Sequence, residues 1–120
     1  MTLRRMKTYA GSQGYVYQYY FVGQRPALPG EPAGAEYIFD VTSDRKTTYA
    51  VSIFLPQQVL QAWTASNGRS LTDAERYGAA KLRLLQAFDE IEDMIAHGRR
   101  VVVSVADLEH VLATLGVSEN

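Results

Sequence analysis

Apolar side chains are densest in residues 15–22, where five aromatic residues fall within eight positions. An aromatic and β-branched run of this kind is typical of a strand. A strand with one face in water alternates apolar and polar residues, but here both sets of alternate positions are largely apolar. Because Gln18 lies in the middle of the even-numbered set, we expect that set to face outward and the odd-numbered set, Tyr15 to Phe21, to face the core.

Two later segments alternate more cleanly and predict an antiparallel hairpin. In residues 36–41 and 48–55, the odd-numbered positions carry most of the large apolar side chains. The segment between them, residues 42–46, has the polar composition of a turn. Ile38 and Phe54 are the exceptions, because the same alternation leaves them on the outer face. We therefore expect the outer face of the sheet to be only partly polar.

A long connection is predicted between the first strand and the hairpin. Residues 23–35 contain three of the four prolines and three of the nine glycines. This composition predicts a loop. Loops of this length without structure of their own are either functional or simple connectors, and the sequence leaves both possibilities open.

Helical periodicity begins after the hairpin. Pro56 suits the first turn of a helix that ends near Gly68. A longer helix is predicted from Thr72, where Glu75 completes a capping box, to Gly98. Its apolar side chains recur on one side, as expected for a helix that packs against a sheet. They are Ala74, Tyr77, Ala80, Leu84, Phe88, Ile91 and Ile95.

The last elements complete the predicted fold. Residues 101–103 are three valines and predict a short buried strand. Ser104 and Asp107 resemble a cap for a final helix that closes at Gly116. The element order is thus β-β-β-α-α-β-α, with a further strand fragment left open before Gly11. We predict an α+β fold, in which an antiparallel sheet of three to four strands packs its helices on one face.

Composition limits the class of protein. A chain of 120 residues with 47% hydrophobic and 21% charged content fits a single domain spanning residues 1–120. The net charge of -1 excludes a strong overall field for nucleic acid or anionic membrane. The absence of cysteine excludes disulfides, thiolate metal sites and cysteine nucleophiles. No secretory signal or membrane-spanning run is evident in the sequence, so we expect a cytoplasmic location.

The sequence gives little support for a catalytic or metal-binding site. The segment Gly11-Ser12-Gln13-Gly14 lacks the spacing of a nucleophile elbow, and phosphate-binding signatures are absent. Asp93 and His97 are four residues apart on the predicted long helix, but two ligands do not make a metal site. We therefore predict no catalytic residue, no metal and no cofactor, and we rank an enzyme third among the function classes.

The leading hypothesis is a non-enzymatic protein-interaction module. An aromatic sheet face is typical of contact surfaces, and its partner would be another protein or a second copy of the chain in a homodimer. In the other register of the first strand, the odd-numbered aromatics form this face. An open alternative is that the N-terminal ten residues or the Pro-rich loop cover the face and leave a monomer. The candidate contact residues are Val16, Tyr17, Tyr19, Tyr20, Arg25 and Arg45.

Nucleic-acid binding is the second hypothesis. Aromatic side chains on a strand can stack on bases, and flanking cations can hold phosphates. The basic-aromatic signature of an RNA-recognition motif is missing, so the support is compositional. The cations available are Arg4, Arg5, Lys7, Arg25, Arg45 and Lys46.

Overall fold

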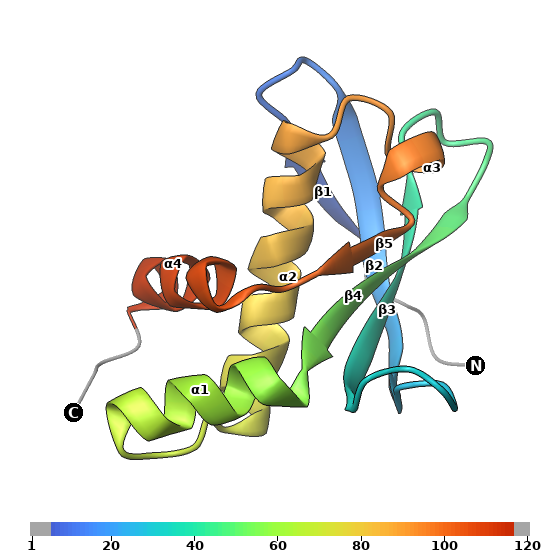
Figure 1. Ribbon diagram of the computed structural model, residues 1–120. Coiled ribbons are helices and arrows are strands. Elements are labelled where there is room, and N and C mark those ends of the chain that lie inside the picture. The colour runs from blue at the N-terminus through green and yellow to red at the C-terminus, as the bar shows by residue number, and fades with distance from the viewer. Residues whose placement is uncertain (1–5, 117–120) are drawn as a thin grey trace.

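The computed structural model of the chain describes residues 6–116 and shows a five-stranded sheet and four helices (Figure 1). The predicted α+β class is confirmed. In chain order the elements are β1 (Lys7–Ala10), β2 (Val16–Pro26), β3 (Gly34–Thr42), β4 (Tyr49–Pro56), α1 (Gln57–Asn67), α2 (Asp73–Glu90), α3 (Met94–His97), β5 (Arg100–Val102) and α4 (Val105–Leu115).

The sheet is mixed, and this corrects the prediction. Its strand order is β1-β2-β3-β4-β5, with antiparallel pairs from β1 to β4 and a parallel pair between β4 and β5. A parallel pair needs a crossover connection, and here α1, α2 and α3 carry the chain back before β5 begins. The prediction of three to four wholly antiparallel strands was therefore wrong in both number and direction. The fragment left open before Gly11 is strand β1.

Strand β2 has the predicted register over its first half. Tyr17 and Tyr19 are buried on the helix side, whereas Val16 is exposed on the other side. A β-bulge between Phe21 and Gly23 then takes up one residue, so that odd-numbered positions face outward beyond it. The strand continues to Pro26 through residues that were predicted as loop, and the connection to β3 shortens to residues 27–33.

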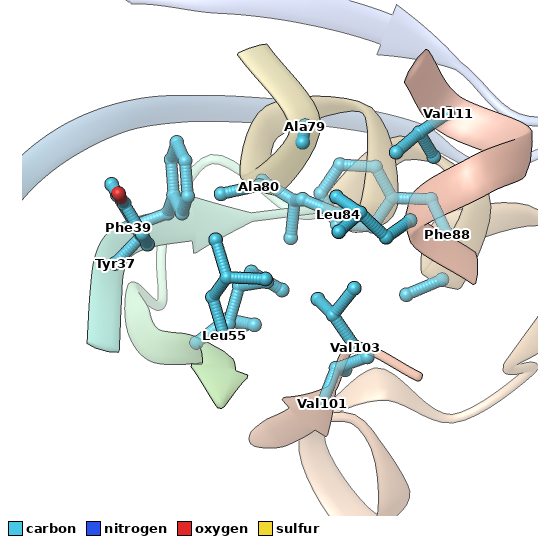
Figure 2. Close-up of a cluster of buried hydrophobic side chains, with 14 of the residues drawn as sticks. Tyr37, Phe39, Leu55, Ala79, Ala80, Leu84, Phe88, Val101, Val103 and Val111 are labelled. Atoms are coloured by element: carbon cyan, nitrogen blue, oxygen red, sulfur yellow. The ribbon is translucent and has the colours of Figure 1, made fainter. Parts of the chain in front are cut away.

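The core lies between the sheet and the helices, since α1, α2 and α4 lie on the same side of the sheet (Figure 1). Figure 2 shows Phe39 and Leu55 of the sheet gathered with Leu84 of α2 and with Val103, which follows β5. All four side chains are fully buried. At one end of the core, the ring of Phe88 stacks on Tyr17 with centroids 4.1 Å apart. The strands and α2 therefore meet through large apolar side chains, as the periodicity predicted.

The predicted long helix is interrupted. It begins as expected, with a complete capping box between Thr72 and Glu75, but α2 ends at Glu90. Ile91 has extended backbone angles, and the side chain of Asp93 accepts a hydrogen bond from the amide of Ala96 to begin the short α3. The prediction of one helix up to Gly98 was thus wrong, because an N-cap at Asp93 starts a separate turn.

The other helices begin and end as predicted. Helix α1 starts after Pro56 and closes at Gly68, which has the left-handed backbone that favours glycine. Helix α4 has a complete capping box between Ser104 and Asp107 and closes at Gly116. Within residues 6–116, none of the helices has the length and apolar character needed to cross a membrane.

Candidate functional site

Within residues 6–116, the helices cover one face of the sheet and leave the opposite face without a helix (Figure 1). We call this opposite side the outer face. Alternation along the paired strands assigns to it side chains from all five strands. Those on β2 to β5 are Val16, Gln18, Tyr20, Arg25, Glu36, Ile38, Asp40, Thr42, Ala50, Ser52, Phe54, Arg100 and Val102.

Apolar side chains cross the outer face in a diagonal band. Val16 on β2 is 47% exposed and Val102 on β5 is 51% exposed, at opposite corners of the face. Tyr20 and Ile38 lie between them and are partly exposed. The two are diagonal neighbours, since Tyr20 lies opposite Asp40 in the pairing of β2 with β3. The band is interrupted on β2 by Gln18 and on β4 by Ser52 and the buried Phe54, but its exposed apolar side chains still form a candidate contact surface.

Tyr20 is held in place by a neighbour on β3. Its hydroxyl donates a hydrogen bond of 2.7 Å to the carboxylate of Asp40. This bond directs the polar end of Tyr20 toward the adjacent strand and fixes the orientation of the ring. Tyrosine is enriched at protein interfaces, and a ring whose orientation is already fixed loses little side-chain entropy on contact.

One corner of the outer face is closed by ion pairs within the chain. Arg25 contacts the buried carboxylate of Glu36 at 2.5 Å, and Arg100 contacts Glu31 of the loop at 2.5 Å. The guanidinium of Arg100 also lies 4.8 Å from the centroid of Phe54, whose ring is buried. Residues 27–33 thus reach the face at this corner through Glu31. The central band from Val16 to Tyr20 has no comparable cover from that loop.

The predicted contact residues separate into two groups. Val16 and Tyr20 lie on the outer face, and Arg45 is exposed in the turn between β3 and β4. Tyr17 and Tyr19 are core residues, only 3% and 4% exposed. We remove these two from the candidate surface, because their side of β2 packs against α2. Arg25 lies on the outer face, but its charge is paired.

The sequence reasoning missed Val102 as a surface residue. Three consecutive valines were interpreted as buried on both sides. In the structure Val101 and Val103 point into the core and Val102 points outward. The missed signal was alternation itself, since successive residues of a strand face opposite sides of the sheet.

The sequence left open whether the N-terminal ten residues cover the outer face, and the structure describes only part of that segment. Residues 7–10 form β1 and extend the sheet at its edge beside β2. Arg4 and Arg5, two cations of the nucleic-acid hypothesis, lie outside the described residues. Among residues 6–116, no group of three or more histidine, aspartate or glutamate side chains gathers to hold a metal ion.

The comparisons with known proteins identified no relative. No protein-family model, curated protein or solved structure matches the chain. Function is therefore inferred from the geometry of the described residues.

Proposed function

We propose that the chain is a non-enzymatic protein-interaction module whose outer face binds a second copy of the chain. The observation that carries the proposal is the one-sided packing of the helices, which leaves Val16 and Val102 about half exposed on the opposite face. Exposed apolar side chains rimmed by polar groups are typical of contact surfaces. The polar rim here includes Gln18 and Asp40.

The charges of the outer face favour a second copy as the partner. On this face the charges of Arg25 and Arg100 are paired with Glu36 and Glu31 of the same chain, and Asp40 adds a negative charge. In a two-fold dimer the same patch meets itself, so a face with both signs can place opposite charges together. The net charge of -1 adds little repulsion between copies.

The size of the apolar band sets the expected affinity. Burying the exposed half of one valine contributes about 1 kcal/mol, so Val16 and Val102 from two copies contribute about 4 kcal/mol. Association itself costs at least about 4 kcal/mol. The valines alone only offset that cost, and Tyr20 and Ile38 must supply the net affinity. We therefore expect a weak dimer, with a dissociation constant in the micromolar range or above.

Sedimentation velocity across protein concentration tests the proposal. We expect wild-type protein to shift from monomer to dimer between about 1 μM and about 1 mM. Val16→Asp introduces a charge into the apolar band of the proposed contact, so it should weaken dimerisation at least about tenfold. Val105→Asp is the matched control, because Val105 is an exposed valine at the start of α4, away from the outer face.

Two results would contradict the dimer. One is a wild-type protein that stays monomeric over the whole range. The other is an equal effect of Val16→Asp and Val105→Asp, since a contact through the outer face requires only the first to matter. Melting temperatures of both variants separate a lost contact from a damaged fold.

Nucleic-acid binding has no specific observation in its favour. Of the aromatic side chains on β2, Tyr17 and Tyr19 lie in the core, and Arg25 and Arg100 are paired with carboxylates. A salt titration with a single-stranded oligonucleotide measures this alternative directly. A steep loss of affinity with salt would support it over the homodimer as the function of the chain.

A further inference from the structure

A cleft of about 560 Å³ lies at the end of the sheet where three distant segments meet. The β1–β2 turn, the β3–β4 connection and α3 all reach this end of the molecule (Figure 1). The cleft is separate from the apolar band of the outer face and belongs to none of the contacts proposed above. Its chemistry comes mainly from Tyr15, Tyr17, Tyr49, Glu92, Asp93 and His97.

The tyrosines give the cleft an aromatic wall with unpaired hydroxyls. Tyr17 and Tyr49 are 3% and 7% exposed, and neither hydroxyl makes a hydrogen bond with another residue in the range 6–116. The ring of Tyr15 lies 6.4 Å from that of Tyr17, tilted by 59°. Both hydroxyl oxygens retain some access to solvent, so each can exchange water for a polar group of a ligand in the cleft.

The cleft also carries negative charge. Glu92 and Asp93 supply two carboxylates, and none of the described lining residues is lysine or arginine. Asp93 uses one oxygen to cap α3, through the amide of Ala96 at 3.1 Å, which leaves its other oxygen for a ligand. Arg99 lies 5.6 Å from the centroid of the Tyr49 ring, but it is outside the lining.

The hydroxyls of Tyr17 and Tyr49 stay neutral at physiological pH. Burial, followed by the nearby Tyr17, raises the pKa of Tyr49 to about 12. Burial also raises the pKa of Tyr17, with smaller contributions from Tyr15, Asp89 and Asp93. Glu92 and Asp93 therefore supply the negative charge of the cleft, and Tyr17 and Tyr49 act as neutral donors, acceptors and aromatic rings.

We propose that this cleft binds an organic ammonium ion, either a lysine side chain or a free alkylamine. An ammonium group donates hydrogen bonds to carboxylates and tyrosine oxygens, and aromatic rings attract it through cation–π interaction. The apolar arm of such a ligand fits against Met94 and Ile95, which also line the cleft. The volume lies within the range of about 300–1,000 Å³ that is typical of small-ligand sites.

Tyrosine ring signals in NMR titrations test the proposal. The probes are butylammonium, lysine blocked at both ends, and norleucine blocked in the same way as a neutral control. We expect both ammonium probes to shift the rings of Tyr15, Tyr17 and Tyr49 and to bind at least about tenfold more tightly than blocked norleucine. If butylammonium and blocked lysine bind equally tightly, the ligand class is a free alkylamine. If blocked lysine binds more tightly, the ligand class is a lysine side chain in a peptide. Equal binding of norleucine would overturn the proposal.

A charge-neutral variant gives an independent test. Glu92→Gln combined with Asp93→Asn removes both charges, and asparagine at position 93 still caps α3. Binding of the ammonium probes should fall at least about tenfold. Asp73→Asn combined with Glu109→Gln is the matched control, because both carboxylates are exposed and lie outside the cleft. A folded Glu92→Gln and Asp93→Asn variant with unchanged binding would also overturn the proposal.

Discussion

Gly34 is a residue whose lack of a side chain shapes the outer face. It begins β3 at the point where the chain passes Phe54 and Leu55 of β4. A Cβ atom at Gly34 would lie 2.6 Å from the carbonyl oxygen of Leu55 and 2.7 Å from the Phe54 ring. This close approach, together with Arg100, buries Phe54 although alternation directs it outward. The sequence predicted the direction of Phe54, but its cover depends on residues far away in the chain.

Gly34→Ala tests this close approach. The added methyl group meets backbone, which cannot move as a flexible side chain can, so we expect a loss of about 1–3 kcal/mol in the free energy of unfolding. Urea denaturation measures it. Gly23→Ala is the control, because a Cβ at Gly23 has no neighbour within 4 Å and its backbone is not left-handed. If both variants lose the same stability, contact with Phe54 and Leu55 is not the cause.

Among whole elements, those with local signals were predictable from the sequence. The caps of α2 and α4 depend on residues three positions apart, so Thr72 with Glu75 and Ser104 with Asp107 were evident. The break after α2 was not evident, because Ile91 falls on the apolar side of the predicted helix although its backbone is extended. The β-bulge before Gly23 was missed for a related reason, since a bulge is defined by pairing with β3 and has no local sequence pattern of its own.

The cap of α2 also has an electrostatic component that can be measured. Arg69 donates two hydrogen bonds of 2.8 Å to the carboxylate of Glu75. Arg69, followed by the amide of Thr72, lowers the pKa of Glu75 to about 2. Because this folded-state pKa is depressed, the stabilisation is present above the ordinary carboxyl pKa and is lost as pH falls through about 2.

An NMR titration of the Glu75 side-chain carboxyl checks this value. We expect a pKa of about 2 in the wild-type protein. In Arg69→Gln the pKa should rise toward the ordinary range, with part of the depression kept by the Thr72 amide. An ordinary pKa in the wild-type protein would show that the Arg69 contact does not persist in solution.

For the whole molecule, the sequence predicted the fold class but not the assembly of its sites. Tyr17 and Tyr19 stayed among the candidate contact residues, although the favoured register directed them toward the core, because a strand pattern does not say which face the helices will cover. Asp93 and His97 were recognised as a pair without partners, and only the fold brings Tyr49 to them. The parallel pairing of β5 likewise depends on the path of the helices. Local patterns therefore define the elements, whereas sites built from distant segments require the structure.

The carboxylate of Asp89 on α2 contacts both β1 and the β1–β2 turn, so it offers a test of that long-range organisation. Asp89 accepts hydrogen bonds from the Tyr9 hydroxyl at 2.6 Å and from the Ser12 amide at 2.8 Å. These two bonds, that of Tyr9 first, lower the pKa of Asp89. They also explain a carboxylate in the last turn of α2, where the helix dipole disfavours negative charge.

Asp89→Ala removes both bonds while leaving the helix intact. We expect a loss of about 1–2 kcal/mol in the free energy of unfolding near neutral pH. The folded-state pKa is depressed, so the stabilisation is present above the ordinary pKa of an aspartate and is lost as pH falls through the lower folded-state value. Urea denaturation at a series of pH values should therefore show the two proteins converging in acid. Glu109→Ala is the control, because Glu109 is an exposed helical carboxylate away from the β1–β2 turn. A difference between wild type and Asp89→Ala that is constant across pH would mean that the charge of Asp89 does not join the hairpin to the helix.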